Sequence, residues 1–258
     1  MCSSDLIETM RGIEELLNPD TRGSGSVCLN LVIKGDYGKG VNLLDACVPY
    51  MDQIVVIHDG TLVGEEGRIF KNFCMSTGVL YIEAPDSGGW PQLHRRLGLA
   101  LTYTDWVLVI DSDEVPNEAL LKGLDDLIQH KSEKSIPGYW ITVDTTEHDG
   151  EFIHSKAPRL LRMTPGISWP VMAHNGPEWF WDAGYEYLID APEEMKIIHS
   201  HTGDESERRT LRNARTVKII LQRWGEYKIA RAHANDIAKG NPLAQEVIKC
   251  YLQQSEQQ

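Results

Sequence analysis

The chain has 258 residues, of which 41% are hydrophobic and 24% charged, so it can bury one large core. Its formal net charge of −13 at pH 7 argues against a surface built for nucleic-acid backbones or anionic membranes. Its five cysteines are scattered and form no C-x-x-C pair, which argues against a disulfide framework or a zinc site.

The first 25 residues differ in pattern from the rest of the chain. A short amphipathic pattern begins at Asp5 and ends at Asn18-Pro19, before a joint rich in glycine and serine. We therefore expect residues 1–25 to be an N-terminal helical appendage and linker. No apolar signal region and no stretch of about 18 apolar residues occurs, so we expect a cytoplasmic protein without a transmembrane segment.

Strand-like and helix-like segments then alternate along the chain. Alternation of this length predicts right-handed βαβ units and an α/β fold with a Rossmann-like, mostly parallel sheet flanked by helices. The predicted strands are 27–33, 53–57, 78–83 and 106–110, and the predicted helices are 41–49, 65–75 and 92–103.

The pattern changes in the second half of the chain. Strand-like segments occur there without regular helices between them, and helical periodicity returns only near the end. We expect a helix at 117–130, strands at 139–144, 158–163 and 196–200, a long loop at 165–187 and a helical C-terminal extension at 205–258.

Polar residues gather where the predicted strands end. The strand at 106–110 runs directly into Asp111-Ser112-Asp113, and Asp36 and Asp59 follow the first two strands. Because the carboxyl ends of parallel strands meet at one sheet edge, we expect these side chains to lie together. Clustered carboxylates of this kind suggest a divalent cation and a phosphate-bearing substrate. The alternative is a polar strand cap followed by a helix N-cap at Pro116-Asn117.

Three stretches carry a family resemblance: VCLNLVIKGD, NLLDACVPYMDQIVVIHDGT and HRRLGLALTYTDWVLVIDSDEVP. They resemble the family 2 type of glycosyltransferase with a GT-A fold, and the later PRLLRM and IIHSHTG fit less tightly. The resemblance covers about residues 26–220. It implies a GT-A-like domain over 26–204, with a nucleotide-sugar half at 26–130 and an acceptor half at 131–204.

The resemblance also implies a donor site. Asp36 and Asp59 would face the base and ribose of a nucleotide sugar, with Lys34 nearby. Arg95 would lie by the donor phosphates or sugar, and Asp111 near the ribose or the metal. The first turn departs from the family pattern, because Lys-Gly-Asp replaces Lys-Asn-Glu.

A metal and a general base complete the implied site. Asp113 would be the main ligand of Mn²⁺ or Mg²⁺ and His199 a further ligand, with His201 as a substitute. Relatives have a His-Glu pair where this chain has His174-Asn175, so the nearest carboxylate, Glu178, is the predicted general base.

The sequence therefore predicts an inverting, metal-dependent glycosyltransferase. It would move a sugar from a nucleoside-diphosphate donor, most simply a UDP-sugar, to a glycan, lipid-linked, protein or modified-nucleobase acceptor. Two alternatives remain open. The D-x-D-x-V pattern at Asp111 and Asp113 also fits a haloacid-dehalogenase-like phosphatase, in which the first Asp is the nucleophile. The other alternative is a non-catalytic sugar-nucleotide binding protein.

The basic cluster in the C-terminal extension has two interpretations. Arg208, Arg209, Arg212 and Arg215 form a patch in an otherwise acidic chain. They provide either a local binding surface for an anion or an ordinary solvated helix face.

Overall fold

A computed structural model gives the fold of most of the chain. The N-terminal segment predicted to be helical and the predicted base Glu178 lie outside the residues that it describes. The described residues are 25–87, 91–129, 136–146, 152–164, 167, 188–200, 205–224 and 228–255.

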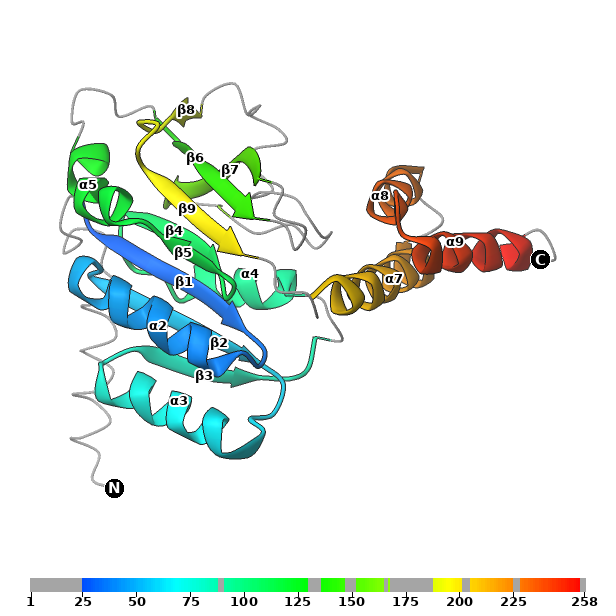
Figure 1. Ribbon diagram of the computed structural model, residues 1–258, viewed down its shortest axis with the longest axis horizontal. Helices are drawn as coiled ribbons and strands as arrows, with labels where there is room; N and C mark the ends of the chain where they lie inside the picture. Colours follow the sequence, from blue (N-terminus) through cyan, green and yellow to red (C-terminus); the bar gives the residue numbers. More distant parts are fainter. Residues whose placement is uncertain are drawn as a thin grey trace.

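The described strands form one nine-stranded sheet, shown in Figure 1, in the order β3-β2-β1-β4-β7-β6-β9-β5, with β8 beside β6. Strands β1 to β4 pair in parallel. Strand β7 pairs antiparallel with β4 and β6, while β6 pairs in parallel with β9. The predicted mostly parallel α/β sheet is confirmed. The bounds are β1 Val27–Ile33, β2 Gln53–Asp59, β3 Leu80–Ala84, β4 Trp106–Asp111, β5 Glu114–Pro116, β6 Gly138–Thr146, β7 Phe152–Arg162, β8 Ile189–Asp190 and β9 Lys196–Ser200.

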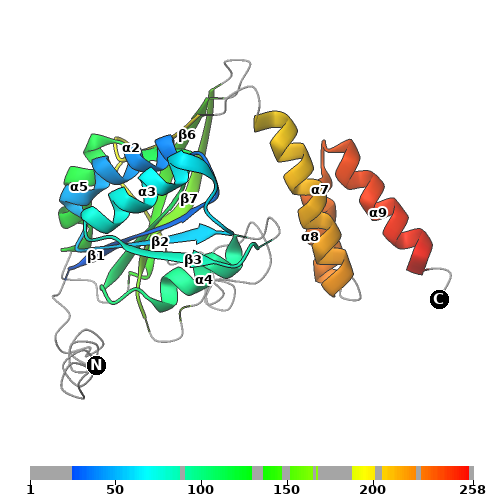
Figure 2. The same ribbon diagram turned by 90° about the horizontal axis from the view of Figure 1, so that it is seen from below.

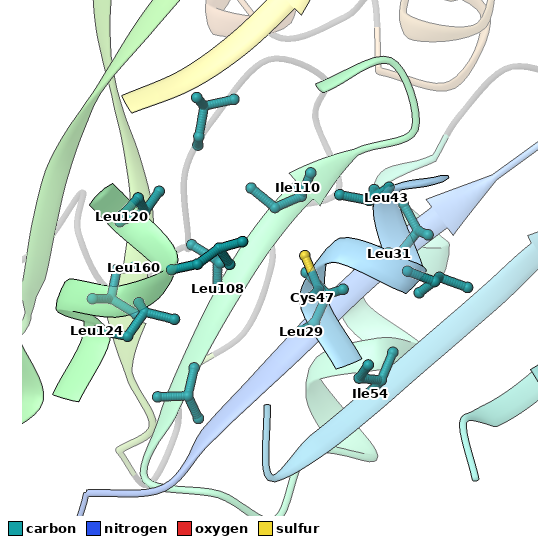
Figure 3. Packing of buried hydrophobic residues seen from close by; sticks show 14 of the residues in the cluster. Leu29, Leu31, Leu43, Cys47, Ile54, Leu108, Ile110, Leu120, Leu124 and Leu160 are labelled. Atoms are coloured by element: carbon teal, nitrogen blue, oxygen red, sulfur yellow. The ribbon is translucent and has the colours of Figure 1, made fainter. Parts of the chain in front are cut away.

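Helices cover both faces of the sheet. Figure 2 shows α2, α3 and α5 on one face and α4 on the other. Side chains of β1 alternate between the two resulting cores, because Leu29 and Leu31 join the larger core and Cys28 joins the smaller one beside α4. Figure 3 shows the larger core packed between β1, β4 and the helices above them. The bounds are α2 Tyr37–Cys47, η2 Val48–Tyr50, α3 Gly64–Ser76, α4 Gln92–Ala100 and α5 Glu118–Ile128.

The predicted bounds of two helices were wrong. Helix α2 begins at Tyr37 and not at residue 41, because Asp36 has a left-handed backbone (φ 49°) that turns the chain from β1 directly into the helix. Helix α4 ends at Ala100 and not at residue 103. There the hydroxyl of Thr102 donates to the carbonyl of Gly98, which ends the helix.

Strands of the second half differ more from the prediction. Strand β7 begins at Phe152, six residues before the predicted start, because it pairs along its whole length with β6. The short strands β5 and β8 were not predicted. Each is defined by pairing with a strand distant in the sequence, β5 with β9 and β8 with β6.

The C-terminal residues form a three-helix unit of α7 Glu205–Trp224, α8 Lys228–Ala238 and α9 Pro242–Ser255. These helices lie beside the sheet in both views and pack on one another around a separate core that includes Val217, Ile220 and Ala234. No helix in the described part of the chain is both long and apolar enough to cross a membrane.

Candidate active site

The candidate site lies at the carboxyl edge of the parallel strands. Strand β1 lies between β2 and β4, so the strand order reverses beside it. Ligands of open α/β sheets bind at such a reversal. The neighbouring strands place Lys34, Asp59 and Asp111 at this one edge.

Asp59 is a buried carboxylate with several hydrogen-bond donors. Ser87 donates its backbone N–H to Oδ1 and its hydroxyl to Oδ2, both at 2.6 Å. His94 of α4 lies 3.0 Å from Oδ1 through its Nε2. Burial alone would raise the pKa of Asp59, but the bonds from Ser87 and His94 outweigh it and lower the pKa. Asp59 is therefore an anion that ties the segment after β3 to the end of β2.

Lys34 and Asp36 occupy the turn after β1. The Nζ of Lys34 lies 2.5 Å from Asp86 Oδ1 and 3.7 Å from Asp59 Oδ2. Asp36 follows with its left-handed backbone and accepts the N–H of Gly40 at its carbonyl. The turn after β1 therefore places cationic and anionic side chains next to each other at the carboxyl edge of the sheet.

Asp111 belongs to a network of two carboxylates and two arginines. Arg95 of α4 bonds Asp111 Oδ1, and Arg159 of β7 lies 3.1 Å from Oδ2. Arg159 also bonds Oε1 of Glu114, while Oε2 accepts the backbone N–H of Asp111 at 2.9 Å. The network joins α4, β4, β5 and β7, so the first carboxylate of the D-x-D motif is held from two sides.

Burial shifts the pKa values in this network. It lowers the pKa of the Arg95 guanidinium to about 10, with a further lowering by the neighbouring Arg159. Burial also raises the pKa of Glu114. The charge of Arg159 lowers this pKa in part, and the charge of Asp113 raises it further. The site therefore concentrates charge in a poorly solvated place, where electrostatic interactions are strong.

Asp113 and His199 meet across the site. The Nε2 of His199 on β9 lies 3.3 Å from Asp113 Oδ2. The other ring nitrogen, Nδ1, lies 3.4 Å from the hydroxyl of Thr145 on β6, which pairs with His199 in register. Both side chains are partly exposed, at 18% for His199 and 29% for Asp113. They present an oxygen and a nitrogen to one point at the surface.

This donor pair fits a divalent cation that takes its remaining ligands from a substrate. Carboxylate oxygen and imidazole nitrogen both bind Mn²⁺, and Thr145 lies where it can fix the other ring nitrogen. Within the described residues, no group of three or more His, Cys, Asp or Glu side chains is arranged to hold a metal ion. A bound metal would thus rely on oxygens from a ligand such as a diphosphate.

Among known proteins, the chain is similar to solved structures and not to any known sequence family. No protein-family model and no curated protein sequence matches the chain. The structure is similar to S. aureus TarS, with a TM-score of 0.50 and 13% identity over 76% of this chain and 40% of that one. It is also similar to S. aureus TarS 1-349 in complex with UDP-GlcNAc, with a TM-score of 0.50 and 13% identity over 76% of this chain and 66% of that one.

The chain has a GT-A-like fold. The predicted resemblance to glycosyltransferases with this fold is confirmed at the level of structure. The chain spans less than half the length of the full TarS structure.

Sequence reasoning missed several groups in the candidate active site. It gave no role to Arg159, which bonds the carboxylates of Asp111 and Glu114. It also gave none to Ser87 and His94, which hold Asp59. The PRLLRM stretch that contains Arg159 was a signal, because an arginine buried in an apolar strand needs an anion beside it. The partner was not identifiable, since β7 reaches β4 only in the folded sheet.

Proposed function

We propose that this protein is a nucleotide-sugar glycosyltransferase. The observation that carries the proposal is the D-x-D segment at the end of β4, beside the reversal of strand order, with Asp113 directed at His199. The GT-A-like fold supports the same activity.

The donor is proposed to be a UDP-sugar. One similar structure, S. aureus TarS 1-349, is a complex with UDP-GlcNAc. In this chain Lys34, Asp36 and Asp59 are proposed to contact the base and ribose. The carboxylates supply hydrogen-bond acceptors for ribose hydroxyls and a base N–H. The anchoring of Asp59 by Ser87 supports a rigid edge at this end of the donor site.

Asp113 and His199 are proposed to hold Mn²⁺ or Mg²⁺ together with donor diphosphate oxygens. When bound, such an ion supplies positive charge that stabilises the diphosphate leaving group. Arg159 and Arg95 are proposed to support this role by fixing Asp111 and by adding positive charge at the same strand end. The charge network keeps Asp111 in place without help from a ligand.

The transfer step needs a base for the acceptor hydroxyl, and Glu178 is proposed for it. The acceptor oxygen forms a bond to the anomeric carbon while the bond from that carbon to the diphosphate oxygen breaks. The electron pair of the breaking bond leaves with the diphosphate. The proton of the acceptor hydroxyl moves to the Glu178 carboxylate. Attack opposite to the leaving group inverts the anomeric centre.

The charge network argues against the phosphatase alternative. A nucleophilic aspartate needs a free carboxylate oxygen. Here Arg95 engages Asp111 Oδ1 and Arg159 engages Oδ2. The D-x-D segment also follows the fourth strand of the described chain, not the first.

Thermal unfolding with Mn²⁺ and UDP tests the proposal. We expect a rise in melting temperature for the native chain, and loss of the rise in Asp113→Ala. The matched control is Asp126→Ala, an exposed carboxylate of α5 that should leave the rise unchanged. A panel of UDP-, GDP- and other nucleoside-diphosphate sugars should then be screened for donor hydrolysis. Absence of any nucleotide-dependent shift and of hydrolysis across the panel would exclude the transferase. A shift without hydrolysis would favour the sugar-nucleotide binding protein.

A further inference from the structure

A buried histidine joins two turns at the carboxyl edge of the sheet. His58 is the next-to-last residue of β2 and is 1% exposed. Its Nδ1 lies 2.8 Å from the carbonyl oxygen of Gly60, and its Nε2 lies 3.0 Å from the hydroxyl oxygen of Tyr37. Tyr37 is the first residue of α2 and directly follows the turn after β1. We call Tyr37, His58 and Gly60 the buried link.

The chemistry of the three groups sets the direction of both hydrogen bonds in the buried link. A carbonyl oxygen can only accept, so Nδ1 of His58 carries the proton that it donates to Gly60. In a neutral imidazole the other ring nitrogen has a lone pair, and it accepts the proton of the Tyr37 hydroxyl. Both ring nitrogens are thereby satisfied in a place without water, where a missing hydrogen bond is costly.

Close packing keeps the Tyr37 hydroxyl at His58. The two rings lie with their centroids 5.7 Å apart and their planes within 17°, and the ring of Phe70 lies 5.6 Å from Tyr37 on another side. Helix α3 lies beside α2 (Figure 1) and approaches the tyrosine at Gly67, where a Cβ would lie only 3.2 Å from two ring atoms. A ring packed this closely has little freedom to turn.

The turn after β1 needs such support. Gly35 and Asp36 both have left-handed backbones, with φ of 74° and 49°. A residue with a Cβ adopts this conformation at a cost in free energy and keeps it where the surrounding structure holds it there. The side chain of Asp36 makes no capping bond to α2. Tyr37, the next residue, connects the turn to β2 through His58.

The same link holds the turn after β2. Gly60 has a left-handed backbone as well, with φ of 90°, and its N–H donates to the carbonyl of Ala84 at 2.9 Å. The bond from His58 fixes the carbonyl of Gly60. Asp59 stands between His58 and Gly60 in the chain, so its backbone is held from both sides. The buried link therefore sets how the two turns lie relative to each other.

We propose that Tyr37 and His58 are positioning residues for the nucleoside part of the donor. The inference rests on the proposed transferase function, in which residues of these two turns contact the base and ribose. Both side chains are buried, so they act on the donor only through the turns that they hold. The diphosphate end of the proposed site depends on other elements, because Asp113 follows β4 and His199 belongs to β9.

A second buried tyrosine provides a matched control. Tyr139 is 2% exposed and donates its hydroxyl to the carbonyl of Leu127 at 2.6 Å. It stands near the start of β6, which runs in the same direction as β4, so it lies away from the carboxyl edge. Tyr139→Phe thus removes a buried tyrosine hydrogen bond of the same kind, but not one that holds a turn of the donor site.

Titration of the full chain with UDP and with pyrophosphate, each in the presence of Mn²⁺, tests the proposal. We expect Tyr37→Phe, which keeps the ring and removes the hydroxyl, to weaken UDP binding by about threefold to tenfold. Pyrophosphate binding should stay unchanged, because this ligand lacks the nucleoside. The control Tyr139→Phe should change neither affinity. Melting temperatures measured on the same samples verify folding.

A substitution at His58 tests whether the tyrosine acts through the histidine. His58→Asn can place an amide N–H near the position of Nδ1 and keep the bond to Gly60, but it cannot reach Tyr37. It should weaken UDP binding as much as Tyr37→Phe does, and the double variant should lose no more than either single one. In hydrolysis of a UDP-sugar, Tyr37→Phe should raise KM and leave kcat unchanged, as expected when binding is lost equally before and during reaction.

The remaining outcomes separate this inference from the transferase function. UDP binding by the native chain with unchanged affinity in Tyr37→Phe would overturn the positioning role and leave the transferase intact. Equal weakening of UDP and pyrophosphate binding, or the same loss in Tyr139→Phe, would show a general structural effect and would also overturn it. A further loss in the double variant would overturn the coupling through His58. No UDP binding by the native chain would contradict the transferase itself, and the positioning role with it.

Discussion

The parallel half of the sheet, β1 to β4, and the mixed half, β5 to β9, contribute differently to the candidate active site. In the parallel half, Asp59 and Asp111 end buried strands, so chain order alone brings them to one edge. The mixed half contributes Glu114, Arg159 and His199 through strands that are distant in the sequence from their neighbours. The mixed half supplies the arginine that pairs with Asp111 and the histidine nitrogen that lies beside Asp113. The site therefore requires both halves to be folded together.

Removal of the histidine from the mixed half should have the largest effect. In His199→Ala, Asp113 loses the nitrogen that lies 3.3 Å from its Oδ2, so metal binding should weaken. We expect the apparent affinity for Mn²⁺, titrated in the presence of UDP, to fall about 100-fold. The control His154→Ala removes a histidine of β7 that contacts Asp144 instead. Equal loss in both variants would contradict a specific role for His199.

Breaking the charge network should cost stability as well as activity. Arg159→Met leaves the buried Glu114 carboxylate without its cation, and we expect the free energy of unfolding to fall by about 3 kcal/mol. Chemical denaturation measures this change. Adding Glu114→Gln should recover part of the loss, because the uncompensated charge is then gone. Arg68→Met, which breaks an exposed pair with Glu65, should have little effect. A similar loss at both positions would argue against a special role of the network.

A second charge cluster lies in the mixed half and should appear in the pH dependence of stability. Asp144 is buried and lies 2.7 Å from His154 Nδ1 and 3.1 Å from Lys196 Nζ. Burial alone would raise the pKa of Asp144, but these two bonds outweigh it and place the pKa below the ordinary 3.8. A lowered pKa stabilises the fold above the unfolded value and loses that contribution as the pH falls through the folded value.

The corresponding test compares the native chain with Asp144→Asn across pH. We expect the native chain to be more stable by about 1–2 kcal/mol at pH 6, with the difference shrinking below pH 4. Urea denaturation at each pH measures it. A difference that stays constant down to pH 3 would show that the carboxylate charge does not contribute.

The smallest expected effect concerns the parallel half. Asn30 is fully buried in β1, and its Oδ1 and Nδ2 have no hydrogen-bond partner among the described residues. Leucine has nearly the same shape, so Asn30→Leu should raise the free energy of unfolding by about 1 kcal/mol. Gly98→Ala should act in the opposite direction, because its Cβ would lie 2.3 Å from Asn30 Nδ2. Destabilisation by Asn30→Leu would indicate that the amide has a role in the native state.

Sequence reasoning succeeded where local patterns determine structure. The bounds of β1 and β9 were predicted without error, and β2 and β4 extend only slightly beyond their predicted ends. It was less accurate where pairing determines structure, as in β5, β7 and β8. A three-residue strand such as β5 has no periodicity of its own and exists because Glu114 pairs with His199.

The sequence by itself determined the alternation of strands and helices, the carboxylates at the strand ends and the basic character of α7. Each of these depends on residues close together in the chain, so periodicity and spacing contain the information. Only the tertiary structure decided that Arg159 bonds both Asp111 and Glu114, and that Asp113 faces His199. Those contacts join residues that only the paired strands bring together, where burial makes a countercharge necessary.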